Sequence, residues 1–131
     1  MSKDADSNIV VRGNQRTIEY AIRTNGSMPA KEFIESLDES DQRKMAALFD
    51  RMAQHGNAPN PTQFKPVRGK IFEFKKHQIR VFCFRKDDRW ILTNGYKKKR
   101  NKLDRAEVDR AERIMREHLE REVSQHKGRR T

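Results

Sequence analysis

Residues 71–96 read IFEFKKHQIRVFCFRKDDRWILTNGY, and this stretch decides the fold. It contains three runs rich in β-branched and aromatic residues, 71–75, 78–85 and 89–96, which are separated by only two or three polar residues. Connections this short join neighbouring strands only as antiparallel hairpins. The stretch therefore predicts a three-stranded antiparallel meander.

A strand and two helices are predicted ahead of the meander. Thr17–Arg23 alternates apolar and polar side chains, as a half-buried strand does. Pro29 and Asp38 then begin two helical patterns, and Gly56 ends the second. Three prolines within residues 57–66 predict an irregular connection to the meander. We expect the apolar positions of both helices to be core residues: Ala30, Phe33, Ile34, Leu37, Met45, Leu48, Phe49 and Met52.

Residues 104–123 carry the pattern of a C-terminal helix. Asp104-x-x-Glu107 forms a capping box at its start. Opposite charges four residues apart are expected to pair along its surface, as Asp109–Arg113, Glu112–Arg116 and Glu117–Arg121. One apolar line should pack on the sheet, and it contains Val108, Ala111, Met115 and Leu119, with Ile114 beside them.

The element order predicts an α+β fold, in which a strand, a two-helix hairpin and a three-stranded meander are followed by a helix packed on a curved antiparallel sheet. A chain of 131 residues is long enough for one such domain. We place this domain at residues 17–123. A flexible lead-in over 1–16, in which Ile9–Val11 could add a short edge strand, precedes it, and a basic tail over 124–131 follows.

The net charge of +11 is concentrated in residues 65–102, which hold 14 Lys and Arg against 3 Asp and Glu. Residues 1–64 hold 8 against 9, and residues 103–131 hold 8 against 7. A merely soluble surface mixes its signs, whereas a positive excess confined to one stretch is typical of a surface that binds a polyanion. We expect this stretch to bind RNA.

Aromatic residues alternate with the basic residues of the same stretch, as in proteins that stack single-stranded RNA bases on rings and hold phosphates with cations. Phe72 with Phe74, and Phe82 with Phe84, are two-residue repeats that we assign to the core. Tyr96 directly precedes four cations, so its ring is a candidate base-stacking platform or proton carrier. The alternative is a ring packed under the C-terminal helix.

The histidines and the cysteine indicate no separate site. His55, His77, His118 and His126 lack metal-ligand spacing, so we expect no metal and no cofactor. His77 could donate a proton from a hairpin turn, although a histidine there is more often simply solvated. Cys83 lies in an apolar strand pattern and is expected to pack as a small hydrophobe. A polar N-terminus and the lack of a long apolar run predict a cytoplasmic protein that does not enter a membrane.

The segment from Val67 to Leu119 resembles the RelE/HigB superfamily of type II toxins, particularly its phage-associated branch. Members of that superfamily carry strands of the form lwElR, yRvly and ivLLhGFvKKt, followed by a final helix. Ile71–Lys75, Ile79–Phe82 and Ile91–Lys98 match these three strands in the same order. Together with the preceding helix hairpin, the resemblance covers about four-fifths of the chain.

The resemblance implies a metal-independent endoribonuclease that cuts mRNA on the ribosome, with a cognate antitoxin as its protein partner. The RNA 2′-hydroxyl would attack the adjacent phosphate. Arg80 would stabilise that phosphate, Lys75 would stand in place of a strand arginine, and Tyr96 with Lys98 would flank the scissile bond. The other cations of the basic stretch would bind the RNA backbone: Arg68, Lys70, Arg85, Lys97, Lys99 and Arg100.

Some positions depart from the superfamily pattern and leave alternatives open. Lys75 replaces an arginine, Asn94 a common histidine, and Lys102-Leu103 a Thr-Pro pair. A lysine offers a point charge where an arginine offers a planar fork. Arg80 shares its strand parity with Phe82 and Phe84, so either a local twist frees its side chain or it ends an apolar row. A non-catalytic RNA- or ribosome-binding module, or a ParE-like inhibitor of DNA gyrase, are the other functions considered.

Overall fold

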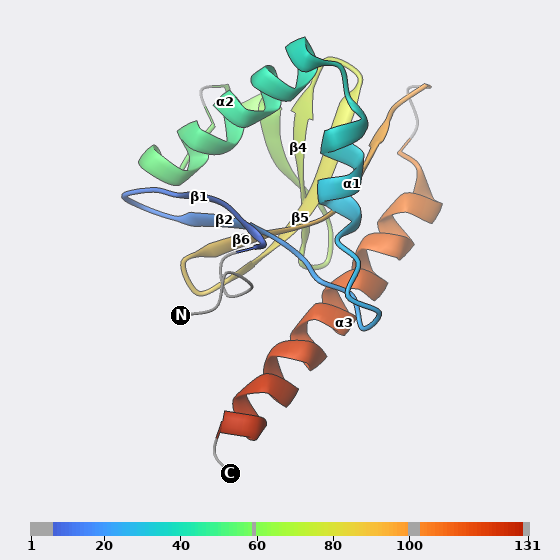
Figure 1. The fold of residues 1–131 in the computed structure, drawn as a ribbon. Helices are drawn as coiled ribbons and strands as arrows, with labels where there is room; N and C mark the ends of the chain where they lie inside the picture. The colour runs from blue at the N-terminus through green and yellow to red at the C-terminus, as the bar shows by residue number, and fades with distance from the viewer. Residues whose placement is uncertain (1–6, 59, 100–102, 130–131) are drawn as a thin grey trace.

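The structure, a computed structural model, describes residues 7–58, 60–99 and 103–129 and has the α+β fold predicted from the sequence. Six strands form one curved sheet in the order β1-β2-β6-β5-β4-β3 (Figure 1). The strands are β1 Ile9–Arg12, β2 Thr17–Tyr20, β3 Phe64–Arg68, β4 Ile71–Lys76, β5 Ile79–Lys86 and β6 Arg89–Lys97. The helices are α1 Pro29–Ser36, α2 Glu39–His55 and α3 Arg105–Arg129, with a short 3-10 helix η2 at Pro61–Gln63.

The helices lie on both faces of the sheet, α1 and α2 on one and α3 on the other (Figure 1). Side chains of a strand alternate between the two faces, so each strand contributes to two apolar clusters. The α1/α2 face buries Phe74, Val81 and Trp90. The α3 face buries Phe82 and Phe84 with the apolar residues of α3. The assignment of these phenylalanines to the core is confirmed, and Phe72 packs partly buried against the first cluster.

The ends of the first two helices follow the local signals in the sequence. Pro29 occupies the first turn of α1. The Asp38 side chain caps α2 by accepting a hydrogen bond from the backbone N–H of Asp41 at 2.7 Å. Gly56 ends α2 in the left-handed conformation, at φ 75°, which glycine adopts without steric cost. These predicted boundaries are confirmed.

Strand pairing differs from the expectation in three places. Phe64–Pro66, expected to be irregular, begins β3, because β3 is an edge strand that tolerates a proline without an N–H. Ile9–Arg12 forms edge strand β1, so the short edge strand considered for Ile9–Val11 is present within the segment 1–16 that was expected to be a flexible lead-in. The pair β2–β6 is parallel, which is possible because the two helices and strands β3 to β5 lie between them in the chain. Residues 1–6 lie outside the described part.

Helix α3 also differs from the expectation, because it runs on to Arg129. A tail over 124–131 is therefore wrong for residues 124–129, and 130–131 lie outside the described part. The expected pairs within the helix are replaced by pairs with other elements. Glu117 binds Arg23 at 2.6 Å, and both Asp109 and Glu112 bind Arg68 of β3. These acids therefore fasten the helix to the rest of the fold.

A second cluster of ion pairs fastens the middle of α3 to the sheet. The Arg89 guanidinium contacts Glu19 at 2.8 Å and Glu122 at 2.7 Å. Burial opposes ionisation of Glu122, but hydrogen bonds from His118, Arg89 and Lys86 outweigh it and hold the pKa of this carboxyl well below its usual value. The charges at this end of the sheet are matched within the protein.

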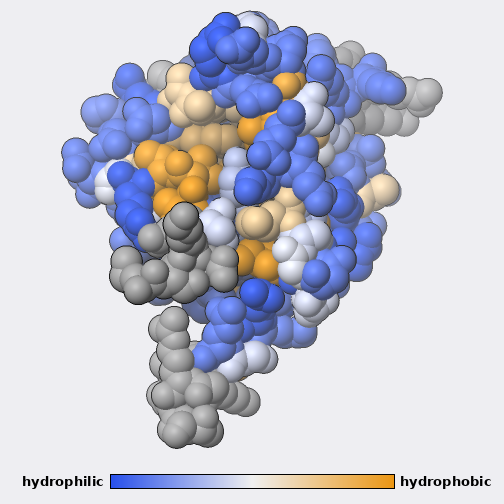
Figure 2. Space-filling model, viewed as in Figure 1, coloured by the Kyte–Doolittle hydropathy of each residue, from blue (hydrophilic) through white to orange (hydrophobic). Residues whose placement is uncertain are grey.

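The outer surface of the molecule is largely hydrophilic, as Figure 2 shows for one face. The largest apolar area in this view lies where the β1–β2 hairpin meets α2. Among the described helices, none combines the length and the apolar character that crossing a bilayer requires.

Gly95 lets α1 approach β6 closely, which generates a prediction for stability. A Cβ at this position would lie 2.3 Å from Phe33 Cδ2 and 3.0 Å from the Arg80 carbonyl oxygen. Gly95→Ala should lower the free energy of unfolding by about 1–3 kcal/mol, because the Phe33 ring must move. Urea unfolding measures this loss, which should shrink in a Phe33→Ala background. An equal loss in both backgrounds would contradict the packing described here.

The Arg23–Glu117 pair predicts a dependence of stability on pH. The hydrogen bond from Arg23 lowers the pKa of Glu117 from 4.5 to about 2. A folded-state pKa below the unfolded one stabilises the protein above pH 4.5, and this contribution is lost as the pH falls towards 2. Glu117→Gln should therefore flatten the fall in unfolding free energy across this window. Glu120→Gln, at an exposed position of the same helix, is the control, and equal slopes in both variants and wild type would refute the pair's role.

Candidate functional site

Three of the four predicted catalytic residues lie side by side across the sheet. The strand register pairs Lys75 of β4 with Arg80 of β5, and Arg80 with Tyr96 of β6. Directly paired residues of neighbouring strands project to the same face. Tyr96 packs with the cluster on the α3 face, so this row faces α3. Lys98 follows Tyr96 by two residues, and its backbone N–H bonds to the Gln78 carbonyl.

Arg80 is buried, with a relative exposure of 5%. Its Nε lies 3.5 Å from a carboxylate oxygen of Glu73, which is buried too. Its Nη1 donates to the backbone oxygens of His77 and Ile79 at 2.6 and 3.0 Å. Of the two arrangements left open by strand parity, the structure has Arg80 at the polar end of the row that contains Phe82. Arg80 therefore does not offer its guanidinium to the solvent.

Tyr96 combines a half-buried ring with a covered hydroxyl. The ring packs on Phe82 with centroids 5.7 Å apart. Its Oη is buried and has no hydrogen-bond partner among the described residues. Burial raises the pKa of this phenol, with the nearby Glu73 acting in the same direction and the Asp104 backbone and Arg80 acting against it. The phenol therefore stays protonated at neutral pH and can act only as a proton donor there.

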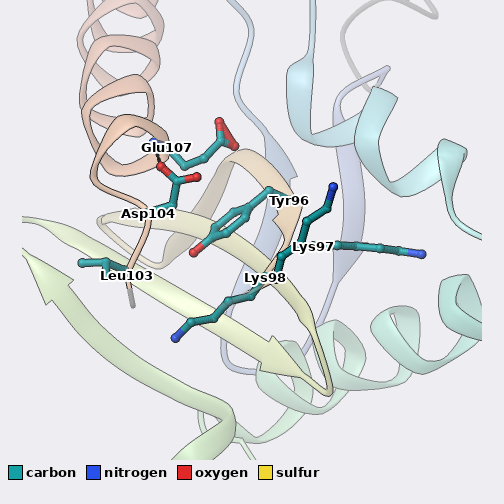
Figure 3. A pocket seen from close by; sticks show the side chains of 7 residues that line it. Tyr96, Lys97, Lys98, Leu103, Asp104 and Glu107 are labelled. Carbon is teal, nitrogen blue, oxygen red and sulfur yellow. Dashed lines mark hydrogen bonds between the residues drawn. The ribbon is translucent and has the colours of Figure 1, made fainter. Parts of the chain in front are cut away.

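A pocket of about 550 Å³ adjoins this row at the start of α3. In Figure 3, the Tyr96 and Lys98 side chains extend toward the same side, beside the first turn of α3. The residues that line the pocket come from the end of β6 and from the segment that begins α3: Tyr96, Lys97, Lys98, Lys99, Leu103, Asp104 and Glu107.

The first turn of α3 is held in place by two polar side chains. Asp104 caps the helix by accepting from the backbone N–H groups of Ala106 and Glu107 at 3.1 and 3.3 Å. Asn94 is fully buried in β6, and its Nδ2 donates to the Glu107 carbonyl at 3.2 Å. Asn94 therefore positions the pocket wall, and its side chain is not exposed where a superfamily histidine is common.

Three pocket residues, Leu103, Asp104 and Glu107, were not predicted as site residues. Asp104 and Glu107 carried a recognisable capping signal, which the structure confirms for the Asp104 side chain. Nothing in that signal shows that the cap lies beside the end of β6. Burial raises the pKa of the Glu107 carboxyl, opposed by the charge of Arg110 and supported by that of Asp104.

The predicted RNA-binding cations have different surroundings. Lys70, Arg85, Lys97 and Lys99 are exposed, while Lys75 and Lys98 are half-buried. Arg68 is already paired with Asp109 and Glu112 of α3, so its charge is balanced within the fold. Arg100 lies outside the described residues. The exposed cations flank the pocket and the hairpin ends of the meander.

A group of potential metal ligands was not apparent from sequence spacing. Single ligand atoms of Glu19, His118 and Glu122 lie within 4.8 Å of one another. However, Arg89 pairs with both carboxylates. His118 Nδ1 accepts the Ile22 N–H at 3.0 Å, and its Nε2 lies 3.0 Å from Glu122, so its ring is already engaged on both sides. These contacts describe a structural network.

The buried Glu73–Arg80 pair generates a prediction for stability. Arg80→Met should lower the free energy of unfolding by about 3 kcal/mol, because it leaves a buried carboxylate without its closest cation. Glu73→Met combined with Arg80→Met should recover most of that loss, since no unpaired charge remains. Urea unfolding of the two single variants and the double variant gives the coupling energy. Additive losses would show that the two groups do not depend on each other.

The comparisons with known proteins identify a family. The family model described as "Phage derived protein Gp49-like (DUF891)" matches residues 32–116, which include the second half of α1, all of α2, the whole meander and the first half of α3. A search of curated proteins found no match. The matched segment contains every strand and helix that lines the pocket. The chain belongs to the Gp49-like family of phage-derived proteins, a family of the RelE/HigB-type toxin superfamily.

Proposed function

We propose that the protein is the toxin of a toxin–antitoxin system and acts as a metal-independent endoribonuclease on mRNA bound to the ribosome. The Gp49-like family suggests a toxin and implies a cognate antitoxin. The observation that carries the finer proposal is the row Lys75–Arg80–Tyr96 beside the lysine-lined pocket. It brings together cations and a phenol, which phosphodiester cleavage needs.

The proposed reaction is attack by the 2′-oxygen of RNA on the adjacent phosphorus. A bond forms between O2′ and phosphorus while the bond to O5′ breaks, which leaves a 2′,3′-cyclic phosphate and a 5′-hydroxyl. The 2′-hydroxyl proton passes to a base, and a proton from an acid passes to O5′. In the proposed reaction, residues of the pocket would carry out both proton transfers, and no metal takes part in either.

Tyr96 is the proposed acid and Lys98 the proposed base. The raised pKa of the Tyr96 phenol keeps its proton available at neutral pH. Lys98 would accept the 2′-hydroxyl proton in its uncharged form. Lys75, half-buried at the end of β4, would stabilise the negative charge that develops on the phosphate oxygens. Arg80, which is paired with Glu73, would add positive electrostatic potential from its buried position. It would also keep Tyr96 in position.

The exposed cations around the pocket support a substrate with many phosphates. Lys97 and Lys99 lie at its rim, whereas Lys70 and Arg85 lie exposed at the opposite end of the strands, where β6 begins. Such a field strengthens binding to RNA whatever its base sequence. Ribosomal RNA and mRNA would both satisfy it, which is consistent with action on the ribosome.

A second candidate is a non-catalytic RNA- or ribosome-binding module. It is favoured by the burial of two proposed catalytic groups, the Arg80 guanidinium and the Tyr96 hydroxyl. A protein of this kind would bind through its exposed lysines and block translation without cutting RNA.

Mapping of RNA ends in cells separates the two candidates. Induction of the wild-type protein in bacteria should arrest growth and create new 5′-hydroxyl ends within translated messages. Tyr96→Phe should reduce these ends by about 100-fold or more, because it removes the acid. Tyr20→Phe is the matched control, since the Tyr20 ring packs on the opposite face of the sheet and should leave cleavage unchanged.

The Tyr96 variant is informative because its stability can be predicted. Its Oη is buried beside the Asp104 backbone, in a contact that falls short of normal hydrogen-bond geometry, so Tyr96→Phe should change the free energy of unfolding by no more than about 1 kcal/mol. A folded Tyr96→Phe protein that cuts like the wild type would refute the proposed acid. Growth arrest without new ends in translated messages would refute the endoribonuclease and support the binding module.

A further inference from the structure

Among the described residues, one acidic side chain of the pocket has no partner within the fold. Asp104 is occupied by its cap at the start of α3. Glu107 also lies in the pocket wall, but its carboxylate has no hydrogen bond or ion pair with any described residue. Only its backbone is engaged, through the Asp104 cap and Asn94. A carboxylate in the wall of a pocket that is also lined by lysines would weaken phosphate binding, so a pocket built for phosphate alone does not account for it.

Glu107 has the properties of a fixed acceptor for a ligand. It is partly desolvated, and burial raises its pKa, which strengthens any hydrogen bond that it accepts in its ionised form. Contacts from both β6 and the helix cap hold its backbone. The backbone is therefore in place before a ligand binds, and only the Glu107 side chain has to be ordered.

The rest of the pocket fits a nucleobase with its phosphate. Tyr96 and Leu103 offer apolar surface to the faces of a ring, and Leu103 is 41% exposed. Lys97, Lys98 and Lys99 lie where a phosphate attached to that base could be held. A volume of about 550 Å³ is within the usual range of sites for small ligands.

We propose that this pocket recognises a guanine base of the RNA, and that Glu107 determines the choice. A carboxylate has two acceptor oxygens, and guanine presents two adjacent donors, N1–H and N2–H₂, on its Watson–Crick edge. Adenine and cytosine each place their amino group beside a ring acceptor, and uracil has a single donor between two carbonyls. Guanine alone among the four fits both oxygens. This inference rests on the proposed function, because it takes RNA as the substrate.

Binding of mononucleotides tests the inference without any cleavage. Isothermal titration of the protein with the 3′-monophosphates of guanosine, inosine, adenosine, cytidine and uridine compares bases that carry the same phosphate. Guanosine monophosphate should bind at least about tenfold more tightly than the inosine compound, which lacks the N2 amino group. Glu107→Gln should abolish that difference. Glu120→Gln, an exposed acid on the same helix, should preserve it.

Each outcome decides the inference. Equal affinities for all five nucleotides, a preference for another base, a guanine preference that survives Glu107→Gln, or no binding at all would each overturn it. None of these results bears on whether new RNA ends form in cells. Conversely, selective guanine binding by a protein that cuts no RNA would support guanine recognition in this pocket and refute the endoribonuclease.

Discussion

The side-chain alternation of β5, fixed by its pairing with β4 and β6, determines where both the core and the candidate site lie. On the face toward α3, β5 presents Phe84, then Phe82, then Arg80. The two phenylalanines pack against α3, and the apolar row ends near the first turn of this helix. From that point the neighbouring positions are Lys75 and Tyr96. The strand register that places the phenylalanines of β5 under α3 also places the polar end of their row beside the first turn of that helix. The candidate site lies at this point.

The two ends of the α3 face handle charge in opposite ways. At the beginning of β6, Arg89 is matched by Glu19 and Glu122, and the cluster fastens α3 to the sheet. At the other end of β6, the lysines 97–99 meet a pocket with two carboxylates, one of them used as a helix cap. The cluster at the first end is matched in charge, whereas the lysines at the second end have no acidic partner among the described residues. The proposed site therefore lies at one end of the same surface.

The burial of Arg80 changes how the catalytic constellation is understood. A guanidinium covered by protein and paired with Glu73 cannot itself be the main contact for a substrate phosphate. In the proposed mechanism the buried guanidinium instead supplies positive charge next to Tyr96, and the half-buried and exposed lysines would contact the phosphate. This division explains how the site can have a lysine, Lys75, at a position where the superfamily has an arginine. The Lys75 ammonium would act near the surface, while the Arg80 guanidinium is held rigidly beneath it.

The sequence was sufficient to predict the elements that depend on local signals. Asp38 and Gly56 mark helix ends through capping and backbone conformation, and short polar links between apolar runs identify the meander. Features that depend on distant parts of the chain were not accessible in this way. Because of Pro66, β3 was not predicted from the sequence. The strand tolerates this proline because it lies at the edge of the sheet.

The same limit applied to the candidate site. Strand parity placed Arg80 on the face of Phe82, but parity does not say whether that face is covered. The role of Glu107 arises from the docking of α3 beside β6, which no local pattern encodes. The resemblance to a known superfamily grouped Lys75, Arg80 and Tyr96 in one expected site, and the register of the three strands shows that they are neighbours.

The account depends on RNA binding at the α3 side of the sheet, at the end where α3 begins. The most direct measurement is the change in backbone amide NMR shifts of the full chain when a short single-stranded RNA is added. The account predicts that the largest changes fall on residues 73–80, 94–99 and 103–107. Changes concentrated instead around Arg51, Gly56 and Phe64, which line a separate pocket between α2 and β3, or no changes at all, would contradict it.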